Sequence, residues 1–430
     1  MTERPLRVLF LQGPPTGFWR ELAETFETAG HRTLKVNLCT ADALFWRRRA
    51  TAFRAPFSRW GDWIAAFLER ERVDAVLYYA DRLPYHATAR AAAERLGIPA
   101  YAVEFGYLRP DWLTLERGGM GAFSHLPADP AAWREMAREA TPPAMDRRFV
   151  HSFAREALMD MAFHLSNALL ALPYPFYRMD KPVHPLIDYP AWIPRLLRGD
   201  REAARAEAVT AEAEGGAWPY HLLALQLSVD YQIRDNTPFR DLGEMIDAVV
   251  ASFARSAGPE RRLIAKLHPL DNGLDDWGAR LAEAAARHGV GERVIAIDGG
   301  RLDALIRHAD GVVLANSTVG LQAIRAGTPV CALGAAVYDM PGLTHQSALD
   351  RFWEAPEAVD RRLAQAFVRA LAARAQVKGS FYAPEGRRLA ALEIVRRVAS
   401  GEVNGPGGVV DPPPRLAALR AAEAARGGRA

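Results

Sequence analysis

The chain has 430 residues, of which 50% are hydrophobic and 24% charged, and its formal net charge is +3. This composition is typical of a folded globular protein, and the length suits two domains of about 150–200 residues each. The small net charge gives no reason to expect a nucleic-acid partner. The apolar runs are too short for a secretory signal or a membrane-spanning helix. Cys39 and Cys331 are far apart in apolar surroundings and are expected to be reduced core residues of a cytoplasmic protein.

The first part of the chain alternates short apolar runs with amphipathic stretches. "RVLFLQG" at 7–13 leads into "GPPTG", and a helical pattern follows over 18–31. The apolar runs "TLKVNL", "AVLYYA" and "AYAVEFG" are separated by helical stretches at 60–72 and 86–97. Alternating strands and helices indicate a parallel sheet covered by helices, and the loop after the first strand lacks the GxGxxG pattern of dinucleotide-binding folds.

The alternation stops between residues 131 and 218 and then resumes. The interval contains a helical stretch at 149–171, a segment rich in Pro and aromatic residues at 172–185, and a mixture of Trp and Arg at 187–200. Strand-like runs then begin again, at 221–230, 262–269, 294–298, 310–317 and 329–334. The tail from 401 is rich in Gly and Pro and then in Ala and Arg, which favours disorder with a weak terminal helix.

These patterns predict an α/β fold of the GT-B-like class, in which two Rossmann-like domains face a central cleft. The predicted parts are an N-terminal Rossmann-like domain for the acceptor at 1–130, a bridging region at 131–218, a C-terminal Rossmann-like domain for the nucleotide sugar at 219–400, and a disordered tail at 401–430.

Polar residues that end the strands of the second half form one candidate site, because ligands of open parallel sheets bind beyond the carboxyl ends of the strands. In "IAKLHPLDNG", Lys266 and His268 are two apart on one strand and therefore point to the same side. "LANSTVGLQAI" at 314–324 ends an apolar run in three hydrogen-bonding residues where a helix begins. A helix cap needs one such residue, whereas free N–H groups at a helix start also suit a phosphate.

Taken together, these features predict a phosphate site, with an ordinary helix cap and a turn histidine as the alternative. Its predicted residues are Lys266, His268, Asp298, Asn316, Ser317, Thr318 and Gly320. The sequence has no DxD element, which favours a sugar activated by a monophosphate, because less charge develops on that leaving group. Sugars of this kind are the CMP-linked 2-keto acids, namely the sialic acids and Kdo. We predict no metal and no cofactor.

Glycosyl transfer also calls for carboxylates. "LQLSVDYQIRDNTPF" places Gln226 and Asp230 four residues apart, and "AVEFGYLRPDWLTLE" ends a first-half strand in Glu104. One carboxylate from each half would serve as nucleophile and as acid/base. Asp111 and Glu116 are expected to be solvated.

Further residues near the predicted strand ends are candidate contacts to the acceptor or the sugar. They are Gly13, Asp81, Arg82, Tyr107, Arg109 and Arg234. For Asp81, pairing with Arg82 or with a helix start is the alternative.

Several long motifs, in order between residues 7 and 400, resemble those of the KpsS-like capsular polysaccharide synthesis/export family, bacterial β-Kdo glycosyltransferases related to KpsC. The motifs are "FLQGPPTGFW", "DRLPYH", "EFGYLRPDWLTLE", "LQLSVDYQIRDNTPF", "KLHPLDNG", "IDGG", "NSTVGL", "YDMPGLT" and "QVKGSFY". The resemblance implies a GT-B-like enzyme that moves Kdo from CMP-Kdo to a phosphatidylglycerol-type lipid and starts the β-Kdo linker of a capsule. CMP-Kdo is itself β-linked, so a β product implies net retention by double displacement.

The resemblance also implies roles for individual residues. His268 with Ser317 and Thr318 would hold the CMP phosphate, Asp230 would be the nucleophile with Gln226 beside it, and Glu104 would be the acid/base. The family often carries two acids before the following glycine, whereas here Phe105 takes the second place. If that second acid were the essential one, the enzyme would be impaired.

The implied location is the cytoplasmic face of the inner membrane of a Gram-negative bacterium. The implied partners are CMP-Kdo, the lipid acceptor, the membrane surface and the capsule assembly or export machinery, including a KpsC-like transferase. Basic and aromatic residues of the bridging region would meet the headgroup layer: Arg147, Arg148, Arg155, Arg195, Arg198, Phe176, Tyr177 and Trp192. Alternatively, the aromatics close the gap between two domains. The competing functions are a non-catalytic export or assembly factor and a GT-B transferase for another nucleotide sugar.

Overall fold

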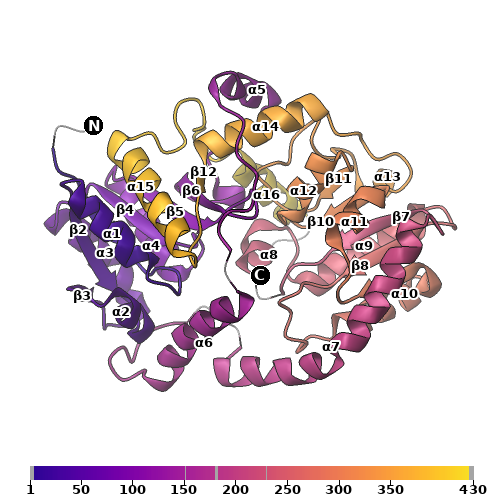
Figure 1. Ribbon diagram of the computed structural model, residues 1–430, viewed down its shortest axis with the longest axis horizontal. Helices are drawn as coiled ribbons and strands as arrows, with labels where there is room; N and C mark the ends of the chain where they lie inside the picture. Colours follow the sequence, from indigo (N-terminus) through magenta and orange to yellow (C-terminus); the bar gives the residue numbers. More distant parts are fainter. Residues whose placement is uncertain (1–3, 151, 180–182, 229, 426–430) are drawn as a thin grey trace. The chain divides into compact units, whose positions relative to one another are not determined.

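The computed structural model describes residues 4–150, 152–179, 183–228 and 230–425. The chain forms two units, each built around one sheet (Figure 1). The first unit comprises Met1–Leu126, Glu139–Leu186 and Val368–Pro412, and the second comprises Pro127–Arg138, Ile187–Phe367 and Pro413–Ala430.

The sheet of the first unit has seven strands in the order β12-β6-β5-β4-β1-β2-β3. The first five strands along the chain pair in parallel, whereas β6 is antiparallel to β5 and β12 is antiparallel to β6. The strands are β1 (Arg7–Phe10), β2 (Arg32–Asn37), β3 (Thr51–Ala52), β4 (Ala75–Tyr79), β5 (Ala100–Phe105), β6 (Trp112–Arg117) and β12 (Gln376–Lys378).

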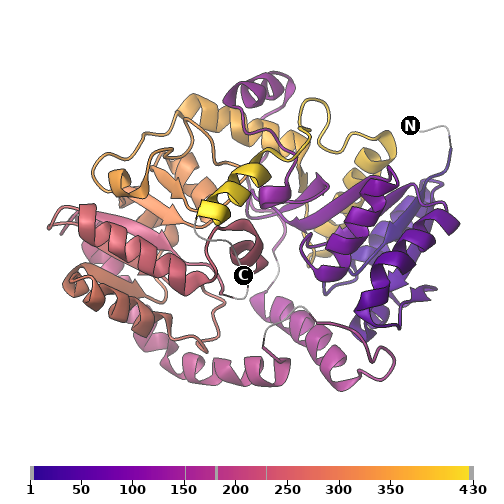
Figure 2. The same cartoon turned by 180° about the vertical axis from the view of Figure 1, so that it is seen from behind.

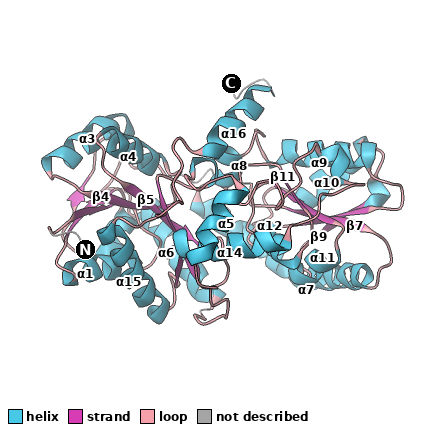
Figure 3. Ribbon diagram, turned by 90° about the horizontal axis from the view of Figure 1, so that it is seen from above, coloured by secondary structure: helices cyan, strands magenta, loops and turns pink. Residues whose placement is uncertain are grey.

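Helices cover both faces of this sheet. They are α1 (Phe18–Thr28), α2 (Thr40–Trp46), α3 (Trp60–Arg70), α4 (Pro84–Arg95), α6 (Phe153–Leu169) and α15 (Pro384–Ser400), with 3-10 turns at Phe57–Arg59 and Gly121–Phe123. Successive side chains of a strand point to opposite faces, so Phe10 packs in the cluster beneath α1 and α15, and Leu9 in the cluster beneath α3 and α4. Figure 3 shows these two helix layers on either side of β4 and β5.

The sheet of the second unit has five parallel strands in the order β11-β10-β7-β8-β9. They are β7 (Tyr220–Ala224), β8 (Arg262–Lys266), β9 (Val294–Ile297), β10 (Gly311–Leu314) and β11 (Val330–Ala332). Ala224 is in register with Lys266, and Lys266 with Ile297. The residues that follow these strands therefore emerge along one edge of the sheet.

Figure 3 shows α9 and α10 on one side of this sheet and α7 and α11 on the other. The helices of the second unit are α5 (Pro130–Glu139), α7 (Pro185–Glu214), α8 (Tyr231–Asn236), α9 (Leu242–Ser256), α10 (Trp277–Arg287), α11 (Leu302–His308), α12 (Val319–Ala326), α13 (Leu349–Phe352) and α16 (Pro414–Ala425), with a 3-10 turn at Gly291–Arg293. Helix α14 (Arg361–Arg374) crosses the boundary between the units.

The predicted α/β class, with two Rossmann-like halves of GT-B-like type, is confirmed. The central cleft stays a prediction. The boundaries differ from the predicted ones, because residues 368–412 return to the first unit. There β12 extends the first sheet, with Val377 in register with Leu113, and α15 packs on α1. The predicted bridging region is divided, since α6 belongs to the first unit and α7, from Ile187, to the second.

The prediction of a disordered tail is wrong for residues 401–425. Asn404 is buried, and its Oδ1 accepts the N–H of Arg117 at 2.7 Å. Arg415 in α16, the yellow helix of Figure 2, is buried and donates to the Val337 carbonyl at 2.6 Å. Residues 426–430 lie outside the described residues.

Cys39 and Cys331 are buried free thiols, as expected, and burial raises the pKa of each to about 12. Within the described ranges, no helix combines the length and the apolar character needed to cross a membrane.

Candidate functional site

The carboxyl edge of the second sheet holds Gln226 after β7 and Asn316 after β10. These strands are neighbours, and the two side chains pair with each other. Gln226 Nε2 donates to Asn316 Oδ1 at 2.9 Å, and Gln226 Oε1 accepts the Asn316 N–H at 3.1 Å. Asn316 Nδ2 also donates to the Gln232 carbonyl at 3.0 Å. Both amides are thus engaged in bracing the strand ends.

Ser317 and Thr318 lie where α12 begins, and both are half-buried. Ser317 Oγ accepts the N–H of Val319 at 3.3 Å, whereas the Thr318 side chain makes no capping hydrogen bond to the helix. Ser317 therefore provides a side-chain acceptor for one first-turn N–H group, which is the role that the helix-cap interpretation predicted. The N–H of Gly320 also donates to Ser317, through its carbonyl at 3.0 Å. The Thr318 hydroxyl is therefore the polar group of this helix start that suits an anion.

Gly320 has a packing role. A Cβ at this position would lie 2.4 Å from Tyr338 Oη and 2.6 Å from Tyr338 Cζ. The Tyr338 hydroxyl donates to the Ser317 carbonyl, so the glycine lets the buried tyrosine hold the start of α12. A contact of Gly320 with the donor stays a prediction.

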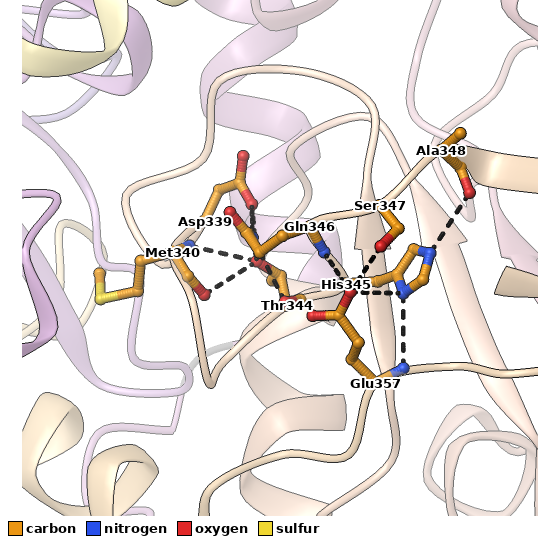
Figure 4. Close-up of polar contacts among 8 residues, drawn as sticks. All are labelled: Asp339, Met340, Thr344, His345, Gln346, Ser347, Ala348 and Glu357. Atoms are coloured by element: carbon orange, nitrogen blue, oxygen red, sulfur yellow. Dashed lines mark hydrogen bonds and ion pairs between the residues drawn. The ribbon is translucent and has the colours of Figure 1, made fainter. Parts of the chain in front are cut away.

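Tyr338 opens the "YDMPGLT" motif in the loop after β11. Figure 4 shows polar contacts among residues of this loop and the segment that follows it, from Asp339 to Glu357. Asp339 Oδ1 accepts from Thr344 Oγ1 at 2.6 Å and from Gln346 Nε2 at 3.3 Å, and burial raises the pKa of Asp339. Farther along, Glu357 Oε1 accepts from Ser347 Oγ at 3.0 Å. These contacts fix the loop that carries Tyr338.

His268 follows β8. In the sheet, β7 separates β8 from β10, the strand that leads into α12. The Nδ1 atom of His268 accepts the N–H of Leu270 at 3.1 Å, which places the proton of the neutral ring on Nε2. An Nε2–H group is a suitable donor to a phosphate oxygen. The imidazole is thus held in the tautomer that the predicted role requires.

Lys266 and Asp298, also predicted donor contacts, have partners within the protein. The buried Lys266 ammonium donates to the Gly299 carbonyl, and burial lowers the pKa of Lys266 while Asp298 opposes that shift. Asp298 forms a two-pronged ion pair with Arg195, whose Nε and Nη2 lie 2.9 and 2.6 Å from its oxygens. The sequence did not assign Arg195 to this site.

Asp230, the predicted nucleophile, precedes α8 and caps it. Its Oδ1 accepts the N–H of Gln232 at 2.9 Å, and its carbonyl accepts the N–H of Ile233 at 3.0 Å. The side chain is half-buried. Gln226 was expected beside Asp230; its amide pairs with Asn316, and its place beside Asp230 stays a prediction.

In the first unit, Glu104 is the penultimate residue of β5, so the strand ends one residue later than predicted, at Phe105. Its Oε1 accepts the N–H of Phe105 at 2.9 Å, and it also accepts a hydrogen bond from the Tyr79 hydroxyl. Burial, reinforced by Glu104, raises the pKa of Tyr79 well above its usual range. Asp160 of α6 also acts on Tyr79, so a second carboxylate lies in this neighbourhood.

Phe105, at the place of the second family acid, belongs to an aromatic cluster. Its ring lies edge-on to Phe381 at 5.2 Å and is stacked on Tyr382 at 6.3 Å. The Arg109 guanidinium lies 5.5 Å above it. A carboxylate at this position would enter an aromatic environment, so the phenylalanine suits its packing.

Asp81 is fully buried at the end of β4. Its Oδ2 accepts the N–H of Met120 at 3.0 Å, and Oδ1 has no hydrogen-bond partner among the described residues. Burial raises the pKa of Asp81 to about 6, although the hydrogen bond from the Met120 N–H and the charge of Arg82 both lower it. The guanidinium of Arg82 lies 3.9 Å above the ring of Phe123.

The raised pKa of Asp81 predicts a pH dependence of stability. The folded protein keeps this proton up to about pH 6, whereas an unfolded chain releases it near 3.8, so stability falls as the pH rises between these values. The contribution is at most about 3 kcal/mol. Asp81→Asn should therefore flatten the fall in unfolding free energy between pH 4 and 6, measured by denaturant titration. A slope equal to that of the wild type would contradict the assignment.

The remaining predicted contacts also have internal partners. A Cβ at Gly13 would lie 2.7 Å from the indole of Trp19, and Tyr107 donates to Glu116 Oε1 at 2.7 Å. Arg234 pairs with the neighbouring Asp235 at 2.9 Å. The expectation that Glu116 is solvated is wrong, because this side chain is fully buried.

Asp111 was also expected to be solvated, and it too is engaged. Its Oδ2 accepts the N–H groups of Arg148 and Phe149, the latter at 2.8 Å. The carboxylate therefore ties down the segment that precedes α6.

The exposed large apolar side chains are concentrated between residues 150 and 197: Val150, Leu158, Met161, Leu169, Leu170, Leu172, Phe176, Leu186, Ile187, Ile193 and Leu197. Phe176 is exposed, as predicted for a headgroup contact. Tyr177 is instead stacked on Tyr85 at 5.8 Å and donates to Gln12 Oε1 at 3.0 Å. Within the described part of the chain, no group of three His, Cys, Asp or Glu side chains is placed to hold a metal ion.

The fold and the site define a protein of two Rossmann-like α/β units whose second sheet collects an imidazole, a lysine and a helix start at its carboxyl edge. The chain belongs to the capsule polysaccharide biosynthesis protein family, whose profile matches residues 74–382. It is 30% identical to the capsule polysaccharide export protein KpsS of Escherichia coli, over 87% of this chain and 97% of that protein.

Two further similarities were found. The capsule polysaccharide modification protein LipB of Neisseria meningitidis is 27% identical, over 89% of this chain and 93% of that protein. Among solved structures, the β-Kdo 2,7 transferase of Thermosulfurimonas dismutans KpsC matches 92% of this chain and 99% of its own, with a TM-score of 0.44 and 13% identity.

Proposed function

We propose that this protein is a glycosyltransferase that moves Kdo from CMP-Kdo to a phosphatidylglycerol-type lipid, starting the β-Kdo linker of capsular polysaccharide. The observation that carries the proposal is that His268, with Nδ1 occupied by the Leu270 N–H, and the half-buried start of α12 follow strands of the same sheet at the same edge. One strand, β7, lies between β8 and β10, so the two strand ends are about 10 Å apart. A sugar nucleotide spans such a distance, with its phosphate between the imidazole and Thr318.

In the proposed reaction, Asp230 attacks the anomeric carbon of Kdo as the bond to the CMP phosphate breaks. His268 and the Thr318 hydroxyl at the start of α12 stabilise the charge that develops on the leaving phosphate. An acceptor hydroxyl then displaces the carboxylate and loses its proton to Glu104 as base. Two inversions give net retention, so the β-linked donor yields a β-linked product.

The acceptor is a lipid, and the exposed apolar side chains between 150 and 197 support contact with a membrane surface. In this proposal the enzyme works at the cytoplasmic face of the inner membrane, beside the capsule assembly or export machinery and a KpsC-like transferase. The names of the E. coli and N. meningitidis relatives support a place in the capsule pathway.

The test is transfer from CMP-Kdo to a fluorescent phosphatidylglycerol acceptor. We expect a new lipid that carries one or more β-Kdo residues, identified by mass spectrometry and NMR. CMP should inhibit the reaction, whereas UDP and GDP at equal concentration should not. Inhibition by UDP or GDP instead would favour a transferase for another nucleotide sugar.

A second candidate, a non-catalytic export or assembly factor, is favoured by the name of the E. coli relative, an export protein. This factor would bind CMP or a glycolipid without turnover. Absence of any CMP-Kdo hydrolysis or transfer, together with measurable CMP binding, would establish this candidate over the enzyme.

A further inference from the structure

Arg195 of α7 joins the two loops that follow β8 and β9. Its guanidinium forms the two-pronged ion pair with Asp298 after β9, at 2.9 and 2.6 Å. On the other side it donates to the carbonyls of Asp271 and His268 in the loop after β8. The contact to the His268 carbonyl is the longer, at 3.4 Å.

The guanidinium is held in this position by its surroundings. It lies 5.3 Å above the ring of Trp192, one turn earlier on α7, and its side chain is only 18% exposed. Asp188, two turns before Arg195 and on the same helix face, accepts from Asn272 Nδ2 at 2.6 Å. The first turns of α7 therefore contact the loop after β8 at two points, through Asp188 and through Arg195.

Apart from a bond at its far end, where Ser228 Oγ donates to Asp275 Oδ2 at 2.9 Å, the loop after β8 has mainly short local contacts. The N–H groups of Leu270, Gly273 and Leu274 donate to side chains two residues earlier in the chain, at 3.1, 2.8 and 3.0 Å. Such local bonds shape a turn without fixing its place on the sheet. The contacts from α7 hold the middle of the loop, residues 268–272, in its place on the sheet.

Arg195 also changes the electrostatic effect of Asp298 at the site. A carboxylate at this strand end would repel a phosphate, and the forked pair neutralises its charge. Asp298 was predicted to contact the donor. The geometry assigns it instead to orienting Arg195.

We propose that Arg195 is a positioning residue that holds the His268 loop against the end of β9, so that the imidazole meets the donor phosphate. This inference rests on the proposed function, because the phosphate is that of a CMP-linked donor. It adds a residue of α7 to a site whose other members lie at the carboxyl edge of the second sheet.

The first experiment measures the loop without any ligand. Hydrogen–deuterium exchange of peptides covering 267–276 is compared in the wild type, Arg195→Ala, Arg195→Lys and Arg198→Ala. Arg198 is exposed one turn further along α7 and is the matched control. We expect exchange in this loop to be about tenfold faster in Arg195→Ala and intermediate in Arg195→Lys, with the β7 to β10 strands unchanged. Unchanged exchange in both Arg195 variants would overturn the inference.

The second experiment measures CMP binding by calorimetry in the same variants. We expect binding about tenfold weaker in Arg195→Ala, equal to wild type in Arg198→Ala, and no weaker in Arg195→Ala/Asp298→Ala than in Arg195→Ala. Looser exchange with wild-type CMP affinity would overturn the positioning role. If the wild type itself bound no CMP, the proposed donor would be wrong, and the exchange data would still decide whether Arg195 holds the loop.

Discussion

Asp230→Asn is expected to abolish Kdo transfer while leaving stability unchanged. In the structure the carboxylate caps α8 through its bond to the Gln232 N–H. Asparagine caps a helix about as well as aspartate does, and its amide oxygen can take the same bond. An amide cannot form the covalent glycosyl intermediate, however, so we expect the initial rate with CMP-Kdo and the lipid acceptor to fall by about 1000-fold or more.

Two control variants separate catalysis from capping. Asp241 caps α9 in the same manner, through a 2.9 Å bond to the Glu244 N–H, so Asp241→Asn should keep full activity. Asp230→Ala removes both the helix cap and the proposed nucleophile, and it should lose about 1 kcal/mol of stability as well as the activity. If Asp230→Asn retained a tenth or more of the wild-type rate, Asp230 would be a helix cap and another carboxylate would have to be the nucleophile.

The local pattern of the sequence was enough to predict most of the strands. A buried parallel strand is a short apolar run that carries its own signal, as "RVLF" and "GVVL" do. The return of the C-terminal part to the first unit carries no such signal. Strand β12 has three residues, and its position depends on pairing with β6 more than 250 residues earlier in the chain. No local periodicity reports which sheet such a strand joins.

For the candidate site, the positions of the residues could be predicted from the sequence, but their contacts could not. Strand ends could be located from the sequence, and His268 and Thr318 lie at such ends. What each polar side chain contacts there depends on residues distant in sequence. Asp298 is engaged by Arg195, 103 residues away, and Gln226 by Asn316, 90 residues away. Because these partners come from other elements, the sequence alone led us to predict a donor contact for Asp298 and a catalytic role for Gln226.

The same limit applies to Lys35, one of only four lysines in the chain. The local pattern predicts that Lys35 lies in a strand, but it does not predict its partner. Its ammonium lies 2.5 Å from Asp42 Oδ2, and the two side chains are 1% and 4% exposed. Burial lowers the pKa of Lys35, and Asp42 opposes that shift. Lys35→Met should therefore cost about 3–5 kcal/mol of unfolding free energy, because it leaves a buried carboxylate without its cation. Urea titration of the intact chain, followed by tryptophan fluorescence, measures this loss.

The double variant Lys35→Met/Asp42→Asn tests whether the loss comes from the unpaired charge. The introduced amide would keep an acceptor for the Leu38 N–H, which now donates to Asp42 Oδ2 at 3.2 Å, and it would carry no charge. We expect this variant to recover more than half of the stability lost in Lys35→Met, since a buried pair contributes little net energy over neutral groups. Arg48→Met, which breaks the more exposed pair with Glu27, should cost less than about 1 kcal/mol. A double variant as unstable as Lys35→Met would show that the lysine stabilises the unit by packing around its stem, and that its charge is incidental.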